Sequence, residues 1–283
     1  MRLNKAREVV LYVFFKVSAL FKGTPKFSIS VLHPEPVLLI DGKLNKEYRR
    51  FIVAADLHLG SETHGIVNEP NLNSKIIFQN TGDKLISLIK SAKADGIILL
   101  GDIKSNVSRI TRLERDFIPP FLTSLSRYAE VYIVPGNHDG LIRYIAPKNV
   151  NLISSSGMLL GDILFIHGHT MPSTIRSSVE RIVMGHLHPI LLKPNNIVNG
   201  QRVWIYMKVR KKAIFSDSVG LLEIIIMPSF DVGLSAPFGH SRRKIISPIL
   251  DRVVKNGDIE EMLYLTLDGS IIADLASLGD MPF

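Results

Sequence analysis

The sequence predicts an α/β fold in which a mixed sheet, or two stacked sheets, carries helices on the outside. In the first half of the chain, short apolar runs typical of buried strands alternate with stretches of helical periodicity. In the second half, strand-like runs follow one another with few helices between them, as in an antiparallel sheet. Apolar residues make up 46% of the 283 residues, which is enough for a sizeable core and too much for a disordered chain.

The strands and helices can be placed along the chain. Strands are expected at the apolar runs 27–32, 37–40, 51–55, 96–100, 131–134, 151–153, 158–160, 163–166, 182–184, 203–207 and 221–227. Residues 83–92 and 110–118 have apolar side chains at helical spacing, and Pro119-Pro120 is expected to end the second helix. Residues 263–273, around Asp268-Gly269, are typical of a hairpin.

Residues 1–26 are expected to form an N-terminal amphipathic helix packed on the body, and residues 27–283 a single domain. Apolar side chains between Val9 and Phe21 recur at helical spacing, with basic residues around them. This run is too short to span a membrane and lacks a clear signal-peptide cleavage site, so we expect no integral membrane span and a cytoplasmic location. Contact of the helix with a membrane surface or a partner is the alternative. No sequence feature indicates an oligomeric state.

Cysteine is absent, which excludes disulfides, thiolate metal sites and cysteine nucleophiles. Histidine, aspartate and asparagine remain as candidate metal ligands. The net charge of +8 favours anionic partners such as phosphate esters or nucleic acid, although a solvated basic surface gives the same total.

Polar side chains of one chemical kind follow five of the expected strands. They are Asp56 and His58, Asp102, Asn137 and His138, His167 and His169, and His186 and His188. Each alone has a simple structural explanation, because aspartate caps helices, asparagine forms turns and a single histidine is more often a core residue. Together they include six of the nine histidines. Since ligands gather at the carboxyl ends of strands in α/β folds, we expect these side chains to converge on one site.

The donor types indicate the metal chemistry. Histidine, aspartate and asparagine suit divalent manganese, iron or zinc. Seven candidate ligands are too many for one tetrahedral ion and fit two ions that share a carboxylate. Two ions roughly 3.5–4 Å apart are the arrangement that holds the attacking and leaving oxygens in phosphoryl displacement.

The order Asp-x-His, Gly-Asp, Gly-Asn-His-Asp, His and Gly-His-x-His, within residues 50–190, resembles the calcineurin-like metallophosphoesterase superfamily. Blocks 55–60, 101–104 and 185–189 resemble its small ICC-type members, which include the DNA-ligase-associated group. The resemblance implies a two-sheet sandwich flanked by helices, with the metal site at the strand ends. It also implies hydrolysis of phosphodiesters, of nucleotide or nucleic-acid origin, through a hydroxide that bridges two divalent ions. Manganese is the ion we expect, with iron or zinc as alternatives.

Carried over motif by motif, the resemblance implies seven metal ligands in two groups around one shared carboxylate. One group is Asp56, His58 and His188, the other is Asn137, His167 and His186, and the shared carboxylate is Asp102. The resemblance makes His138 the residue that stabilises the phosphate and protonates the leaving oxygen. That role suits a side chain that ordinarily titrates near neutral pH.

Further residues are expected around the ligands. His167 is preferred to His169 as the ligand because it directly follows the strand at 163–166, and His169 then supports it. Asp139 is expected to act as a cap or support. Lys104 and Arg176 are candidates for contact with the substrate phosphate, with placement on the surface as the alternative.

One position departs from the family pattern. The family has Gly-Asp-x-x-Asp, in which the second aspartate helps to orient the histidine that follows asparagine in the Gly-Asn-His motif. Here Ser105 occupies that place. Asp139 or a group outside the motifs is the candidate replacement for orienting His138.

Two other functions are compatible with the motifs. The first is a DNA nuclease similar to the double-strand-break repair exonucleases, which share the Asp-x-His-Leu-Gly block but differ at the position of Ser105. The second is an inactive binding scaffold built on the same fold. Such scaffolds lose ligands, whereas all seven are present here.

Overall fold

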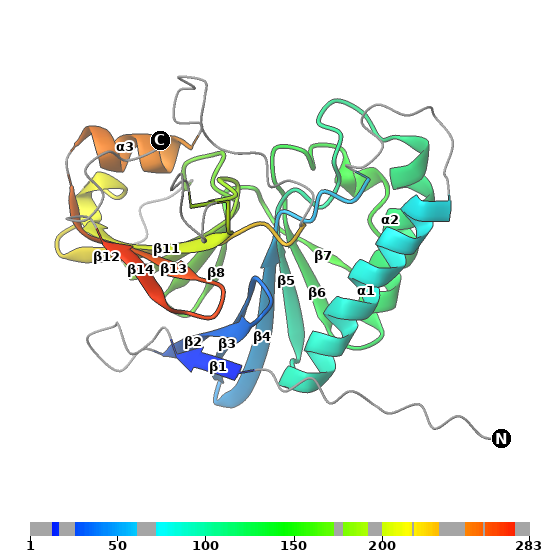
Figure 1. Ribbon diagram of the computed structural model, residues 1–283, viewed down its shortest axis with the longest axis horizontal. Coiled ribbons are helices and arrows are strands. Elements are labelled where there is room, and N and C mark those ends of the chain that lie inside the picture. Colours follow the sequence, from blue (N-terminus) through cyan, green and yellow to red (C-terminus); the bar gives the residue numbers. More distant parts are fainter. Residues whose placement is uncertain are drawn as a thin grey trace.

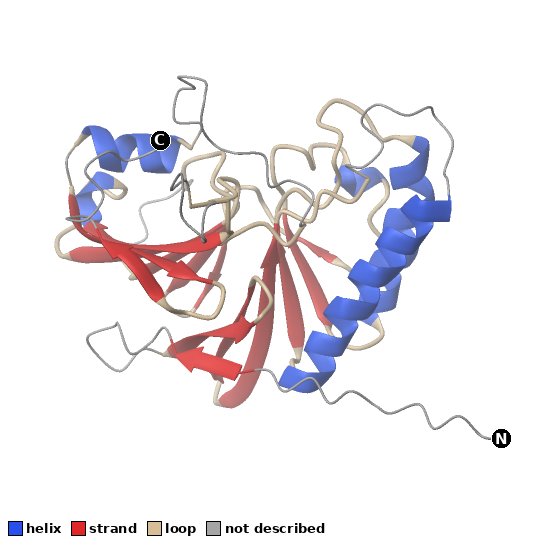
Figure 2. Ribbon diagram, in the orientation of Figure 1, coloured by secondary structure: helices blue, strands red, loops and turns tan. Residues whose placement is uncertain are grey.

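The computed structural model describes residues 13–16, 26–60, 72–172, 178–191, 200–216, 218–231, 247–256 and 258–274. These residues form two seven-stranded sheets that face each other, with helices on their outer sides (Figure 1, Figure 2). The two-sheet sandwich implied by the resemblance is therefore confirmed.

The first sheet contains the strands of the N-terminal half in chain order. They are β1 (Val13–Lys16), β2 (Phe27–His33), β3 (Val37–Leu44), β4 (Glu47–Ala55), β5 (Gly96–Leu100), β6 (Glu130–Val134) and β7 (Asn151–Leu152). Strands β4 to β7 are parallel, and the earlier pairings are antiparallel. Helices α1 (Leu72–Ala92) and α2 (Arg112–Ser126) connect the parallel strands and cover the outer face of this sheet (Figure 1).

The second sheet mixes parallel and antiparallel pairs. Its spatial order is β14 (Ile271–Asp274), β13 (Ile259–Thr266), β11 (Val203–Arg210), β12 (Leu221–Ile226), β10 (Arg181–Met184), β9 (Ile163–Ile166) and β8 (Met158–Leu160). Strands β9, β10 and β12 are parallel. Helix α3 (Pro248–Lys255) and the single turns η3 (Ile142–Tyr144) and η4 (Lys211–Ala213) complete the described elements.

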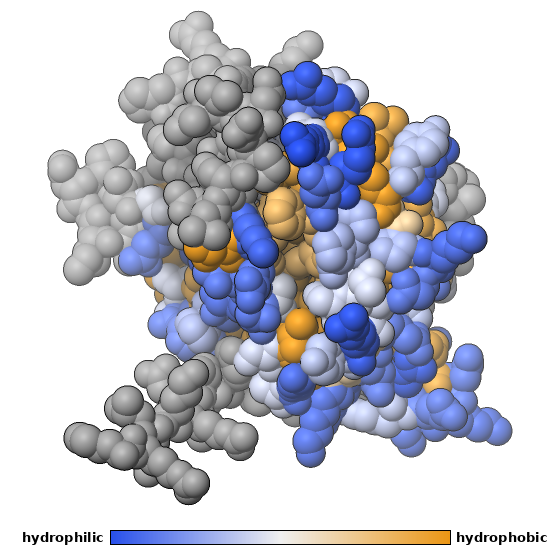
Figure 3. All heavy atoms as spheres, turned by 90° about the vertical axis from the view of Figure 1, so that its right-hand side faces the viewer, coloured by the Kyte–Doolittle hydropathy of each residue, from blue (hydrophilic) through white to orange (hydrophobic). Residues whose placement is uncertain are grey.

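Three apolar clusters separate the layers. Between the sheets, side chains such as Val53 and Phe165 pack together. Outside the first sheet, Leu85 and Leu122 belong to the cluster formed with α1 and α2, and outside the second sheet Ile249 of α3 packs on a third cluster. The side of the molecule that carries α1 and α2 is largely hydrophilic on its outer surface, with smaller hydrophobic areas (Figure 3). Strands covered on both faces explain the continuous apolar runs of the sequence.

The predicted N-terminal helix is wrong where the structure describes that segment. Val13–Lys16 forms β1, which pairs antiparallel with β2 at the edge of the first sheet. The β-branched and aromatic residues of Val13-Phe14-Phe15 favour a strand, and the edge of β2 offers main-chain partners that an apolar periodicity does not reveal. The other residues of the predicted helix, 1–12 and 17–25, lie outside the described part of the chain.

The expected break at Pro119-Pro120 is also wrong, because α2 runs through both prolines. The helix starts at Thr111, whose side chain and that of Glu114 form a capping box. The two prolines remove the main-chain hydrogen bonds to the carbonyls of Arg115 and Asp116, which belong to residues exposed to water. Burial of the apolar side of α2 against the first sheet therefore outweighs the cost of the prolines.

Pro120→Ala is expected to raise the free energy of unfolding by about 1–3 kcal/mol. Pro120 is exposed, so the change removes no core contact and restores an N–H that can donate to the carbonyl of Asp116. Urea unfolding measures the difference, and the exposed Arg115→Ala on the same helix serves as control. Loss of stability in Pro120→Ala would show instead that the prolines shape the helix for its packing.

Candidate metal centre

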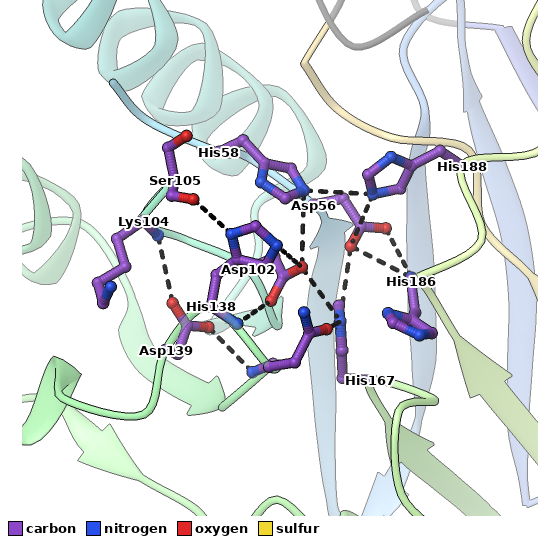
Figure 4. Close-up of polar contacts among 12 residues, drawn as sticks. Asp56, His58, Asp102, Lys104, Ser105, His138, Asp139, His167, His186 and His188 are labelled. Atoms are coloured by element: carbon purple, nitrogen blue, oxygen red, sulfur yellow. Dashed lines mark hydrogen bonds and ion pairs between the residues drawn. The ribbon is translucent and has the colours of Figure 1, made fainter. Parts of the chain in front are cut away.

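Five strand ends meet in one place between the two sheets. Strands β4, β5 and β6 are parallel neighbours, as are β9 and β10, so the carboxyl ends of each set lie along one edge. The loops that follow these strands gather there (Figure 2), and their aspartate and histidine side chains point toward one another (Figure 4). The structure brings together all seven residues expected as ligands, which are Asp56, His58, Asp102, Asn137, His167, His186 and His188.

Main-chain pairing continues past the ends of β4 and β5. The N–H of Asp56 donates to the carbonyl of Gly101 at 3.1 Å, and the N–H of His58 donates to the carbonyl of Asp102 at 2.8 Å. These bonds hold the two loops side by side, so three of the expected ligands project from a fixed backbone.

The backbone of the site adopts conformations that L-residues rarely take. Eight non-glycine residues in the described ranges have positive φ, and five of them belong to the expected ligand set. These five are Asp56, His58, Asp102, His186 and His188, with φ between 43° and 72°. Such conformations cost of order 1–3 kcal/mol each and cluster at functional sites. This clustering is evidence for a site that is independent of the residue types.

Two glycines make room for the polar side chains. A Cβ on Gly136 would overlap the carboxylate of Asp102, and a Cβ on Gly101, whose φ is +78°, would overlap the ring of His167. Glycine beside the motif residues is therefore required by the close approach of neighbouring loops.

Asp102 stands between two groups of donor atoms (Figure 4). On one side, Nε2 of His188 lies 3.3 Å from Oδ1 of Asp56 and 3.2 Å from Nε2 of His58. Oδ2 of Asp102 lies 3.6 Å from Nε2 of His58 and, on the other side, 3.4 Å from Nε2 of His167. The carboxylate of Asp102 is almost fully buried and contacts both groups of donor atoms.

The second group is ordered around His167. Nδ1 of His167 faces the carbonyl of Leu100 at 3.1 Å, and a carbonyl can only accept, so Nδ1 carries the hydrogen. Nε2 is then free to act as a donor atom to a metal, and it lies 3.3 Å from Oδ1 of Asn137. The ring of His186 lies 4.9 Å from that of His167, centroid to centroid.

His138 and Asp139 have different surroundings, although they are adjacent. The N–H of His138 donates to Oδ1 of Asp102 at 2.9 Å, its Nε2 lies 3.7 Å from Oδ2 of the same carboxylate, and its Nδ1 makes a short hydrogen bond with the carbonyl of Ser105. The buried carboxylate of Asp139 instead accepts main-chain N–H groups of Gly136 and Ile103, each at 3.0 Å. Asp139 supports the loops, and the main chain at Ser105 orients His138.

Of the three other residues expected around the ligands, only His169 lies beside the cluster in the described part of the chain. Lys104 is neither at the surface nor in contact with the cluster, which corrects both expectations for it. Its side chain is fully buried, and Nζ donates to the carbonyls of Asn106 and Arg109. His169 is half-buried beside His167, with ring centroids 5.2 Å apart. Arg176 lies outside the described residues.

Glu114 is a buried residue near the site that the sequence reasoning did not single out. Its carboxylate accepts main-chain N–H groups of Ser105 and Asn106. The pattern Thr-x-x-Glu at Thr111 and Glu114, typical of a helix start, is the signal that could have drawn attention to it.

More than half of the chain matches one known protein family. The family described as calcineurin-like phosphoesterase matches residues 49–205, which contain every expected ligand. The chain belongs to the calcineurin-like phosphoesterase family. Membership indicates a hydrolase that acts on phosphoesters with divalent metal ions.

Solved structures give a weaker likeness to this phosphoesterase. Nuclease MPE of Pseudomonas putida is 12% identical and aligns over 92% of this chain and 100% of its own, with a TM-score of 0.52, which shows the shared fold. YfcE, a phosphoesterase from E. coli, is 14% identical over 80% of this chain and 98% of its own, with a TM-score of 0.37, which is too low to support an argument. A search of curated proteins found no match. None of the helices in the described ranges is long and apolar enough to cross a membrane, and the cytoplasmic location stays a prediction.

The donor atoms of the phosphoesterase fit divalent cations. Burial lowers the pKa of His58 to about 4, and burial together with the charge of His167 lowers the pKa of His186 to about 4, so both rings are neutral at pH 7. Nε2 of His186 is buried and has no hydrogen-bond partner among the described residues. Leaving such an atom without a partner costs free energy, which a bound cation removes.

Asp102 and His167 of the phosphoesterase shift each other's pKa values in opposite directions. Burial alone raises the pKa of Asp102, but the neighbouring His167, His138 and His58 hold it below its usual range. Burial alone lowers the pKa of His167, but the hydrogen bond and charge of Asp102 and the charge of Asp56 raise it to about 9. A cluster that holds a proton this firmly in the absence of metal offers a strong site for a cation.

Metal-free phosphoesterase is expected to be most stable near pH 6.5. The folded pKa values of His58 and His186, about 4, lie below the unfolded value of about 6.5, so unfolded chains bind more protons and stability falls as the pH drops. Between pH 6.5 and 5 the loss is of order 1–2 kcal/mol per histidine. His167 acts in the opposite sense, because its stabilisation is complete below pH 6.5 and is lost as the pH rises through about 9.

Urea unfolding of the metal-free protein at pH 5, 6.5 and 8.5 measures this profile. His58→Gln and His186→Gln should each flatten the acid side. Equal stability at pH 5 and 6.5 in the parent protein would contradict the expectation.

Proposed function

We propose that the protein is a two-metal phosphodiesterase whose substrates are nucleotides or nucleic acids. The observation that carries the proposal is the position of Asp102, which belongs to one triad of donor atoms and lies 3.6 Å from Nε2 of His58 in another. Within each triad, one donor atom per residue lies within 4.8 Å of the others, and the triads are Asp56-His58-His188 and Asp102-His167-His186. Asn137 approaches the second triad through His167. This division supports the partition of ligands implied by the motifs, with Asp102 shared.

These residues would hold divalent ions, with manganese as our first choice, which would supply a nucleophile from water at neutral pH and offset charge on the phosphoryl oxygens. The residues of the chain do the remaining work. His167 keeps its hydrogen on Nδ1, which leaves Nε2 available to bind a cation. Asp102 holds both triads and also the main chain of His138. These contacts fix the geometry before the substrate arrives.

His138 is the proposed proton donor. Its Nδ1 hydrogen is used by the carbonyl of Ser105, so Nε2, which faces the carboxylate of Asp102, is the atom that can give a proton to the substrate. In hydrolysis, water loses a proton to the solvent and its oxygen forms a bond to phosphorus, while the bond to the leaving oxygen breaks and that oxygen takes the proton from Nε2, which the solvent then restores.

The net charge of +8 supports an anionic substrate. The structural neighbour from Pseudomonas putida is a nuclease, which makes DNA the second substrate to test, although an identity of 12% carries no more than the fold. An inactive scaffold is disfavoured because every expected ligand reaches the cluster.

The test uses protein stripped of metal and supplied with manganese, iron or zinc in turn. Metal-dependent hydrolysis of bis-p-nitrophenyl phosphate is the expected result, and single-stranded and double-stranded DNA separate a small-diester enzyme from a nuclease. Binding of fewer than two ions per chain, or no metal-dependent hydrolysis of any of these esters, would overturn the proposal. Metal analysis of protein prepared without chelator tests the scaffold, for which a metal content near zero is expected.

A further inference from the structure

Two buried charged side chains that the proposed chemistry does not use bind the segment between β5 and α2. They are Lys104, which is fully buried, and Glu114, which is 1% exposed. Neither contacts a ligand of the metal centre through its side chain. Both bind main-chain groups of residues 105–111, and Ser105 in this segment contacts His138 (Figure 4).

The contact that matters is the hydrogen bond between Nδ1 of His138 and the carbonyl of Ser105. Because a carbonyl only accepts, it selects the form of the ring in which Nδ1 carries the hydrogen. The other nitrogen, Nε2, then points to Asp102, and any second proton on the ring resides there. The position of one main-chain oxygen thus decides which nitrogen of His138 faces the substrate.

The main chain at that oxygen is held by Glu114. Oε1 of Glu114 accepts the N–H of Ser105 at 3.0 Å and the N–H of Asn106 at 2.8 Å. The N–H of Asn106 belongs to the same peptide group as the carbonyl of Ser105, so fixing one fixes the plane of the other. Oε2 accepts the N–H of Thr111 at 2.8 Å, which ties the segment to the start of α2.

Lys104 holds the same segment from the opposite side. Its ammonium donates to the carbonyl of Asn106 and, at 3.1 Å, to that of Arg109. The peptide groups on both sides of Asn106 are therefore bound, one through its N–H by a carboxylate and the other through its carbonyl by an ammonium. Hydrogen bonds to charged groups are stronger than neutral ones, so this segment has one well-defined conformation.

We propose that Glu114 is a positioning residue for His138 and acts through the peptide group between Ser105 and Asn106. In the family pattern a carboxylate at the place of Ser105 orients the histidine directly. Here the carboxylate comes from α2 and acts through one peptide group. The inference rests on the proposed function only for its kinetic consequence, since the form of the His138 ring is a property of the metal-free protein.

Three variants separate positioning from stability. Glu114→Ala removes all three acceptor contacts. Glu114→Gln keeps an amide oxygen for the N–H groups of Ser105 and Asn106 and loses only the bond from Thr111. Thr111→Ala removes the side-chain cap of α2 and leaves the contacts of Glu114 to the segment, so it is the matched control for destabilisation.

The first measurement is the ¹⁵N–¹H spectrum of the histidine rings in the metal-free protein, with His138 assigned from the signals missing in His138→Gln. Parent protein, Glu114→Gln and Thr111→Ala are expected to show His138 with hydrogen on Nδ1. Glu114→Ala is expected to show a mixture of the two ring forms. Glu114→Asp keeps the charge but withdraws the carboxylate by one methylene, so it gives the same shift toward a mixture even if Glu114→Ala does not fold.

The second measurement compares two diesters that differ in the leaving group. p-Nitrophenolate leaves without protonation, whereas the 5′-oxygen of a thymidine dinucleotide needs a proton. Glu114→Ala is expected to lower kcat on the dinucleotide about ten-fold or more with little change on bis-p-nitrophenyl phosphate, and to add nothing in a variant that already lacks His138. An unchanged His138 ring in both Glu114→Ala and Glu114→Asp overturns the inference. If the parent protein hydrolyses neither diester, the proposed function fails and the spectra still decide the role of Glu114.

Discussion

Replacing Asp102 by asparagine is expected to lower kcat/KM for a phosphodiester by about 10³-fold or more. The carboxylate oxygen Oδ2 lies 3.6 Å from Nε2 of His58 and 3.4 Å from Nε2 of His167, which are the nitrogens expected to bind the two ions. Asparagine keeps the size of the side chain but removes the negative charge that both cations need. Losing several kcal/mol of charge stabilisation corresponds to a rate loss of that order.

Metal content should fall together with the rate. We expect two ions per chain in the parent protein and one or fewer in Asp102→Asn, measured by mass spectrometry of the protein after gel filtration. Asp139→Asn is the matched control. Asp139 is equally buried and lies on the neighbouring loop, but its carboxylate accepts only main-chain N–H groups. It should lose stability and keep both ions, so a normal metal content in Asp102→Asn would argue against a shared carboxylate.

The convergence of the motif residues could be predicted because it follows from chain direction. Apolar runs such as 51–55 and 96–100 indicated buried parallel strands, and the polar residues directly after them had to lie at one edge of a sheet. Asp56 and Asp102 lie at that edge as expected. The second sheet supplies His167 and His186 in the same way, because β9 and β10 are also parallel.

Features that depend on other parts of the chain could not be predicted from local patterns. The helical periodicity before Phe21 does not indicate that the edge of β2 is available for main-chain pairing. Val13–Lys16 pairs with that edge. Proline rules predicted a break in α2 because they describe an isolated helix, whereas here the sheet holds the helix together. In both cases tertiary contacts outweigh local preference.

The orientation of His138 shows the limit at the level of single atoms. The motif predicts that a side chain orients His138 in place of the aspartate that the family has where this chain has Ser105. The group that does so is the main-chain carbonyl of Ser105. A carbonyl has no signature in the sequence, because every residue carries one. Only the fold of residues 104–111 around Lys104 and Glu114 shows which carbonyl is used.

His138 itself has two structural interpretations that metal analysis can separate. His58, Asp102 and His138 also have donor atoms within 4.8 Å of one another, which is a grouping in which His138 would be a metal ligand. However, the hydrogen on Nδ1 is engaged by Ser105, and the role proposed for Nε2 is to deliver a proton. A ligand and a proton donor differ in what their loss changes.

His138→Gln is therefore expected to keep two ions per chain and to lower kcat on a dinucleotide by about 10²–10⁴-fold, the range typical of general acid catalysis. Its KM should change little, because the interaction is made as the leaving oxygen gains charge and not when the substrate binds. On bis-p-nitrophenyl phosphate the loss should be much smaller, since p-nitrophenolate leaves without a proton. His33→Gln, outside the cluster, controls for the loss of a histidine. Loss of an ion in His138→Gln, with equal rate losses on both esters, would instead make His138 a ligand and leave the proton donor to be found elsewhere in the cluster.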